Sequence, residues 1–275
     1  MQMQIGARTD VGRMRSNNED NFKVVPELNL FVLSDGMGGE AHGEVASQMA
    51  VEGVAEHFTS YKPGASTAAG RTDLSECSIR LVNAVRTANR SIFELASKNP
   101  THRGMGATVV AACVEGQRLC LAHVGDSRAY LLRAGTLQQL TNDHSLVAEQ
   151  VRRGILTQQQ AEESDMASVL TRAMGIDTNV EVDVDEHILL PDDALLLCSD
   201  GLSRMVTDPE IGSTLLTISD PQQAVDRLVE LANENGGADN VTVVVVRISE
   251  EKKGFLRRIW RWLASPVDST SSDTR

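Results

Sequence analysis

Aromatic side chains are scarce in this chain, where they account for 3% of 275 residues, so a core must be built from aliphatic side chains and methionine. The four cysteines include no Cys-x-x-Cys pair, and three of them lie within apolar runs, which indicates buried free thiols and not zinc ligands or disulfides. No apolar run is long enough to span a bilayer, and the N-terminus lacks a signal-peptide pattern. We therefore expect a cytoplasmic protein.

Basic residues are outnumbered, with 26 Lys and Arg against 38 Asp and Glu, which gives a formal net charge of -12. This excess of negative charge disfavours nucleic-acid binding. Several catalytic motifs are also missing: the Gly-x-x-x-x-Gly-Lys-Ser/Thr phosphate loop, the Gly-x-Ser-x-Gly elbow and the His-Glu-x-x-His helix. No cysteine lies in an arginine-flanked loop that would activate it as a nucleophile.

Four aspartates each stand where a short apolar run starts or stops: Asp35, Asp126, Asp200 and Asp239. Such runs, rich in Val and Leu and bounded by Gly, Asp and Ser, predict buried strands. Any one of these aspartates alone would more often be a turn or helix-cap residue. At the ends of several strands, however, they would gather carboxylates that repel one another unless cations neutralise them. Oxygen-only ligands favour Mg2+ or Mn2+ over zinc, and the pattern predicts more than one ion.

The order of the predicted elements indicates an α+β fold. Strands are expected within residues 1–35, in succession over 107–140, before residues 190 and 200, and over 241–248. Helices are expected at 44–59, in a long segment ending near 98, at 146–153, just after 157, at 208–216 and at 221–235. Consecutive strands favour antiparallel pairing over alternating strand and helix units. The prediction is two antiparallel sheets flanked by helix pairs.

The chemistry that such a site favours is the transfer of a phosphoryl group to water. Two divalent ions that share a carboxylate can activate a bridging water near neutral pH. The oxygens of a phosphoryl group also need a cationic partner, and arginine offers bidentate geometry. The segment from Asp10 to Asp20 supplies Arg13 and Arg15 beside an acidic pair. Without the four aspartates, this segment would more simply be a polar hairpin connection.

Eight short motifs follow the order found in one known family: residues 15–20, 34–39, 104–108, 125–130, 140–145, 170–175, 198–201 and 236–240. In them the chain is similar to the metal-dependent protein phosphatases of the PPM type, the protein phosphatase 2C family, in its bacterial branch. The resemblance covers roughly residues 4–248 and implies a four-layer α-β-β-α sandwich with two central antiparallel sheets.

The resemblance implies a binuclear metal centre. By motif, Asp35 would bridge two Mn2+ or Mg2+ ions, and the carbonyl of Gly36 would bind one of them. Asp200 and Asp239 would complete the ligands of the second ion. These residues are therefore the expected catalytic and metal-binding set.

The resemblance assigns further residues around that centre. Glu19 and Asp20 would act through metal-bound water or as hydrogen-bond acceptors near the ligands. Asp126, together with Asp200, would form the third and weaker metal site seen in bacterial members. Arg15 would grip the substrate phosphate.

The proton donor for the leaving group is left open by the sequence. Many eukaryotic relatives carry a histidine directly after the Asp-Gly pair, as a proposed general acid, whereas this chain has Met37 there, as bacterial members do. A metal-bound water could donate the proton instead. Among side chains, His42 is the nearest candidate, although a histidine at a helix entry is more often a polar surface residue.

The C-terminal segment goes beyond what the family needs. We expect a catalytic domain over residues 1–249, a basic amphipathic helix over 250–264 and a disordered tail over 265–275. Residues 252–263 hold both tryptophans of the chain and five basic residues. Such a helix could lie on an anionic membrane, dock in the groove of a partner or fold back onto its own domain.

The sequence thus predicts a Mn2+- or Mg2+-dependent phosphatase for phosphoserine and phosphothreonine in proteins. Its expected partners are phosphorylated proteins and a cognate bacterial Ser/Thr kinase. We expect a cytoplasmic monomer, attached to the inner face of the membrane if its tail binds lipid. Two alternatives remain open: a catalytically weak regulatory or scaffold module of the same fold, and a small-molecule phosphatase.

Overall fold

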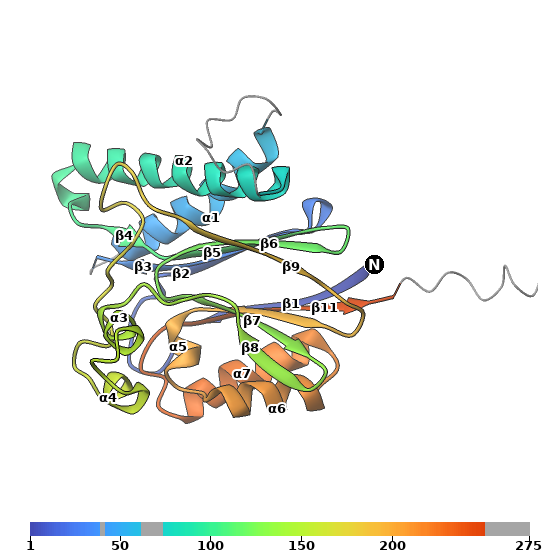
Figure 1. The fold of residues 1–275 in the computed structure, drawn as a ribbon. Coiled ribbons are helices and arrows are strands. Elements are labelled where there is room, and N and C mark those ends of the chain that lie inside the picture. Colours follow the sequence, from blue (N-terminus) through green and yellow to red (C-terminus); the bar gives the residue numbers. More distant parts are fainter. Residues whose placement is uncertain (39–41, 62–73, 251–275) are drawn as a thin grey trace, which may run out of the picture.

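The structure is a computed structural model that describes residues 1–38, 42–61 and 74–250. Two antiparallel sheets lie face to face, and a pair of helices covers the outer face of each (Figure 1). The predicted four-layer α-β-β-α sandwich is confirmed. Among the described residues, no helix has the length and apolar character needed to cross a membrane. The predicted basic helix over 250–264 and the tail over 265–275 lie outside the described residues from residue 251 onward.

The first sheet has the strand order β1-β11-β10-β7-β8. Strands β10 and β11 lie in its middle and are buried on both faces, which is why their sequences are continuous apolar runs without alternation. Helices α6 and α7 cover its outer face (Figure 1). The elements of this layer are β1 (Gln2–Asp10), β7 (Arg128–Arg133), β8 (Thr136–Gln139), β10 (Ala194–Cys198), β11 (Val241–Ser249), α5 (Asp200–Ser203), α6 (Asp208–Thr217) and α7 (Pro221–Glu234).

The second sheet has the order β2-β3-β5-β6-β9. The short strand β4 pairs with the C-terminal end of β3, after the part of β3 that pairs with β5. Helices α1 and α2 pack against its outer face (Figure 1). The elements of this layer are β2 (Asp20–Val25), β3 (Leu30–Met37), β4 (Gly106–Ala107), β5 (Val109–Glu115), β6 (Arg118–Val124), β9 (Asp183–Ile188), α1 (His42–Ser60) and α2 (Glu76–Lys98). Two 3-10 turns accompany them, Pro26–Leu28 and Pro100–His102.

A polar segment between β8 and β9 lies at one end of the sandwich and carries two short helices (Figure 1). These are α3 (Leu146–Arg152) and α4 (Gln158–Glu162), close to their predicted positions. A side chain caps the N-terminus of each helix. Ser145 accepts a hydrogen bond from the N–H of Ala148, and Thr157 and Gln160 form a capping box. We refer to residues 154–170, which include α4, as the flap segment.

Aliphatic side chains fill three buried clusters, as the scarcity of aromatic residues requires. One cluster lies between the sheets, one between the second sheet and the helices α1 and α2, and one between the first sheet and the helices α5, α6 and α7. Between the sheets, fully buried members include Leu33, Leu121, Leu197 and Val244. Under α1 and α2 they include Val54, Leu81 and Val85, and under α5, α6 and α7 they include Leu196, Leu215 and Leu228.

The strands predicted over 107–140 do not form one sheet. Strands β5 and β6 make a hairpin in the second sheet, whereas β7 and β8 make a hairpin in the first. The chain changes sheets between Val124 and Arg128. Gly125 has φ +107°, a conformation that favours glycine, and a Cβ at this position would lie 2.6 Å from the side chain of Thr108. The local pattern predicts hairpins, but only this turn decides which sheet each one joins.

All four cysteines are buried free thiols, as the sequence predicts. Cys113 and Cys120 are direct partners across the β5–β6 hairpin.

Two glycines that follow aspartates allow close backbone contacts. A Cβ on Gly36 would lie 2.0 Å from the carbonyl oxygen of Gly43, where β3 meets the start of α1. A Cβ on Gly201 would lie 2.0 Å from the carbonyl oxygen of Asn240, where α5 meets the start of β11. The Asp-Gly pairs therefore bring chain segments together, in addition to marking the ends of strands.

Candidate metal centre

Asp20 and Asp35 are direct partners on the neighbouring strands β2 and β3, so their side chains lie on the same face. The backbone of Asp35 is held on both sides by Thr108. Its N–H donates to Thr108 Oγ1 at 2.9 Å, and its carbonyl accepts from the Thr108 N–H at 2.8 Å. This pairing fixes where the Asp35 carboxylate lies.

The first sheet supplies two more carboxylates from the ends of adjacent strands. Asp200 begins α5 directly after β10, and Asp239 stands just before β11. Asn240 joins this region to the segment that precedes β2. Its Oδ1 accepts from the N–H of Glu19 at 2.8 Å, and its Nδ2 donates to the carbonyl of Asn17 at 2.8 Å. Sequence reasoning did not single out Asn240, whose long-range contacts leave no local pattern.

All of these residues except Asp20 line one cavity of about 530 Å³. Ser168 and Leu170 of the flap segment also line it. Of the residues proposed from the sequence, the cavity lining includes Arg15, Glu19, Asp35, Gly36, Asp126, Asp200 and Asp239.

Asp20 is not part of the described cavity lining, and its side chain connects the two sheets. Its Oδ2 accepts from the hydroxyl groups of Ser199 and Thr242, both at 2.7 Å and both from the first sheet's side. Its Oδ1 has no hydrogen-bond partner among the described residues. Burial, opposed by these hydroxyl groups, raises the pKa of Asp20 to about 7.

Burial and neighbouring negative charges also raise the pKa of Asp35 and Asp126. Burial raises the pKa of Asp35 well above its usual value, and the charges of Asp20, Asp200 and Asp126 add to the effect. Burial and the charge of Asp200 raise the pKa of Asp126 to about 7. Asp200 Oδ1, like Asp20 Oδ1, has no partner in the described part of the chain.

The residues fit hard divalent cations. Carboxylates from both sheets converge on one cavity, where Asp200 Oδ1 has no partner among the described residues, and repulsion among these carboxylates is what a bound cation would relieve. The side chains that would bind an ion there offer oxygen alone, without sulfur or imidazole nitrogen, which is typical of Mg2+ and Mn2+ sites.

Two arginines lie against this cluster. Arg15, whose side chain is 53% exposed, donates from Nη2 to Asp239 Oδ2 at 2.8 Å. Arg204 places Nη2 at 2.7 Å from Asp200 Oδ2 and at 3.3 Å from Asp126 Oδ2. Sequence reasoning missed Arg204, although its spacing of four residues after Asp200, on a helical turn, is a signal for such a pair.

His42 does not belong to the described cavity lining. Its ring packs edge-on against His102, with 5.4 Å between the ring centroids. The assignment of His42 as a general acid therefore gains no support from this placement.

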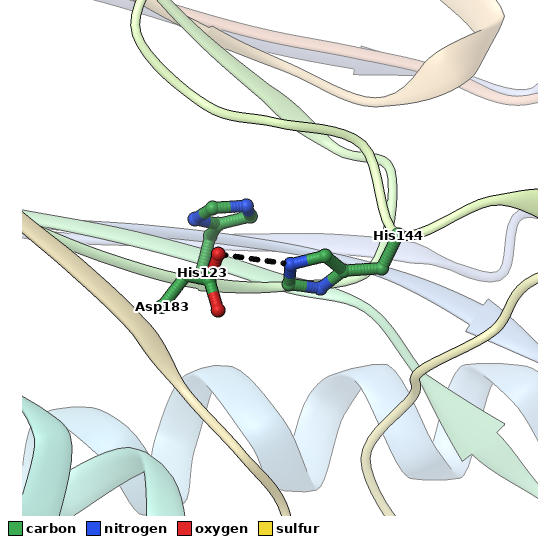
Figure 2. Close-up of side chains that lie close together, drawn as sticks. All are labelled: His123, His144 and Asp183. Carbon is green, nitrogen blue, oxygen red and sulfur yellow. Dashed lines mark ion pairs between the residues drawn. The ribbon is translucent and has the colours of Figure 1, made fainter. Parts of the chain in front are cut away.

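A second cluster of possible metal ligands lies outside the cavity lining. His123, His144 and Asp183 place one nitrogen or oxygen atom each within 4.8 Å of the others. Figure 2 shows the His144 ring directed at the Asp183 carboxylate, at 3.3 Å from Nε2 to Oδ2. The rings of His123 and His144 stack with centroids 4.6 Å apart.

Hydrogen bonding explains this second cluster better than a metal does. The N–H of Gly125 donates to His144 Nδ1 at 3.1 Å, so the neutral ring carries its proton on Nε2 and has no lone pair there for a metal. Arg172 already supplies a cation, with Nη1 at 2.5 Å from Asp183 Oδ1. Burial, with His123 and Arg172 nearby, lowers the pKa of His144 to about 4, which keeps the ring neutral.

The neutral ring supports the backbone beside Asp126. The N–H of His144 donates to the carbonyl of Gly125 at 3.0 Å, while the ring accepts from the Gly125 N–H. Both backbone groups of Gly125 are thus held by one residue. His144 therefore fixes the turn that carries Asp126 into the cavity.

Comparison with known proteins identifies the family. The sequence pattern of protein phosphatase 2C matches residues 13–245. The chain belongs to the protein phosphatase 2C family. It is 37% identical over 250 residues to the serine/threonine phosphatase Stp of Listeria welshimeri, covering 90% of this chain and 96% of that protein. As a member of this family it is a protein phosphatase, and the alternative of a regulatory module is not favoured.

Solved structures agree with this family. The crystal structure of the Mycobacterium tuberculosis serine/threonine phosphatase PstP/Ppp has a TM-score of 0.80 and 38% sequence identity, over 90% of this chain and 99% of that one. A catalytic domain of PstP, solved in complex with two manganese ions, has a TM-score of 0.77 and 37% identity, over 90% of this chain and 99% of that one.

The neutral state of His144 predicts a pH dependence of stability. Its pKa is lower in the folded protein than in the unfolded chain, so the unfolded chain binds an extra proton as the pH falls from about 6.5 towards 4. Folding stability is therefore lost over that range. His144→Asn keeps an acceptor for the N–H of Gly125. Its free energy of unfolding should fall between pH 7 and pH 5 by about 1–2 kcal/mol less than that of the wild type. Urea unfolding at both pH values measures it, and equal losses in the two proteins would contradict the argument.

Proposed function

We propose that this phosphatase removes phosphate from serine and threonine side chains of proteins, using two Mn2+ or Mg2+ ions held by Asp35, Asp200 and Asp239. The observation that carries the proposal is the convergence of these carboxylates from both sheets on one cavity, where the buried Oδ1 of Asp200 lacks a partner among the described residues. The manganese complex of the PstP relative supports the number and type of ions.

Each residue of the cavity has a distinct part in this proposal. Asp35, between the other carboxylates, would bridge the ions, and the Gly36 carbonyl would bind one of them. Asp200 and Asp239 would bind the second ion. When bound, the ions would activate water and neutralise charge on the phosphoryl group. Glu19 and Asp20 would accept hydrogen bonds from the water around them.

Arg15 would orient the substrate phosphate. Its guanidinium is half exposed and anchored at one end by Asp239, so its other N–H groups can be directed at phosphate oxygens. An arginine in this position would hold a phosphoryl group close to the ions.

The leaving serine or threonine oxygen would take its proton from water in the cavity. His42 is the alternative from the sequence, but its ring packs on His102 and is not part of the described lining.

We also propose a cytoplasmic monomer with its catalytic domain in residues 1–249, which opposes a cognate Ser/Thr kinase on phosphorylated proteins. A small-molecule phosphatase is the remaining enzymatic alternative. The relative kcat/KM for a phosphothreonine peptide and for a small phosphate ester discriminates between them, because a small-molecule enzyme would prefer the ester.

Asp35→Asn should lower the turnover of a phosphothreonine peptide in Mn2+ by at least about 100-fold, because the bridging charge is lost while the side-chain volume is kept. Asp226→Asn, on helix α7 in contact with Arg8, is the matched control and should retain wild-type turnover. Phosphate release measured with and without Mn2+ tests this. Near-normal, metal-dependent turnover of Asp35→Asn would mean that the metal site lies elsewhere.

Arg15→Ala should raise KM for the peptide by about 10- to 100-fold while Mn2+ affinity changes little, because charge-assisted hydrogen bonds to phosphate are lost. Arg13→Ala serves as the control, since Arg13 is exposed and absent from the described cavity lining. Steady-state kinetics and a manganese titration measure both effects. If KM rises for Arg13→Ala and not for Arg15→Ala, phosphate recognition belongs to Arg13.

For the tail, we propose that the basic and tryptophan side chains of residues 252–263 attach the enzyme to anionic membranes. The full chain should co-sediment with vesicles that contain anionic lipid, and a chain that ends at Glu250 should stay in solution. Equal binding by the two proteins would refute the membrane role and leave a partner groove or the catalytic domain as the docking site.

A further inference from the structure

A cation of the chain itself lies where the family resemblance expects a third metal. Asp126 and Asp200 are the expected ligands of that ion, and Arg204 Nη2 contacts both, at 3.3 Å and 2.7 Å. The side chains of the two aspartates are 9% and 12% exposed, whereas that of Arg204 is 33% exposed. The guanidinium thus closes the space between the two carboxylates from the solvent side.

The backbone holds Arg204 in this place. It follows the short helix α5, and its N–H donates to the carbonyl of Asp200 at 2.9 Å. A residue four positions after Asp200 on a helical turn projects to the same side as Asp200. The ion pair with Asp200 is therefore a local consequence of the sequence, and Asp126 is brought to it by the turn between the sheets.

A metal ion and Arg204 compete for the same oxygens. A divalent cation would have to approach the carboxylates to about 2.0–2.2 Å, next to a guanidinium that keeps its positive charge at all ordinary pH values. Two positive charges at this separation repel, and Asp126 Oδ2 and Asp200 Oδ2 are already engaged. The third metal site does not fit the residues that the chain places there.

We propose that Arg204 replaces the third metal ion, so that this enzyme binds two ions and uses Asp126 to anchor an arginine. This inference rests on the proposed two-metal function. The same guanidinium lies 3.5 Å from the carbonyl oxygen of Ala167, in the flap segment. Arg204 therefore also connects the carboxylates to the segment whose Ser168 and Leu170 line the cavity.

Counting bound manganese tests the proposal without relying on activity. Isothermal titration calorimetry and electron paramagnetic resonance of free Mn2+ would be applied to the full chain and to three variants: Arg204→Ala, Asp126→Asn and the double variant. We expect two ions for the wild type, three for Arg204→Ala, and two for both proteins that carry Asp126→Asn. The third ion should thus appear only when Arg204 is absent and Asp126 is present.

Two further variants separate charge from packing. Arg204→Lys keeps a positive charge and should bind two ions, while Arg204→Gln keeps part of the side-chain volume without charge and should bind three. Arg204→Gln also replaces Arg204→Ala if the latter does not fold, as judged by circular dichroism.

Three ions in the wild type, or two in a folded Arg204→Gln, would overturn the replacement of the metal by Arg204. These results would leave the two-metal function intact. No bound manganese in the wild type would overturn the two-metal function and, with it, this inference.

Discussion

Repulsion among buried carboxylates is the constraint on which the rest of this structure depends. The cavity gathers aspartates from both sheets, and burial makes their negative charges costly. Each surrounding feature reduces that cost. Hydroxyl groups of Ser199 and Thr242 donate to Asp20, while arginines pair with Asp239 and Asp200. Asp200 Oδ1 still has no partner among the described residues. A divalent ion bound in the cavity would offset the remaining negative charge.

The sequence predicted much of the fold and the aspartates of the site, because both depend on short patterns. An apolar run that ends in aspartate is visible without a structure, and so is the order of strands and helices. The contacts of Asn240 and Arg204 depend on residues far away in the chain. The division of four strands between two sheets depends on one turn at Gly125. His42 was proposed for its closeness in sequence to Gly36, but its ring packs on His102.

Two clusters show that possible ligands grouped in space do not by themselves identify a metal site. At Asp183, beside His123 and His144, Arg172 already neutralises the carboxylate. The His144 ring accepts from the Gly125 N–H, and His123 Nε2 pairs with the carbonyl of Asn142. At Asp35, no arginine contact is present among the described residues, and burial together with the charges of neighbouring aspartates raises its pKa. The distinction depends on where the arginines lie, and arginine positions are therefore as informative as those of the aspartates.

The guanidinium of Arg204 is part of the chain, so every molecule carries it at any concentration of divalent ions. A chelator cannot remove it, and dilution does not weaken it. With Arg204 between Asp126 and Asp200, the flap segment keeps its link to the carboxylates even when divalent ions are scarce. If Arg204 replaces the third ion as proposed, sensitivity to metal shortage would be confined to the two proposed ions, and two binding events would set the steepness of that response.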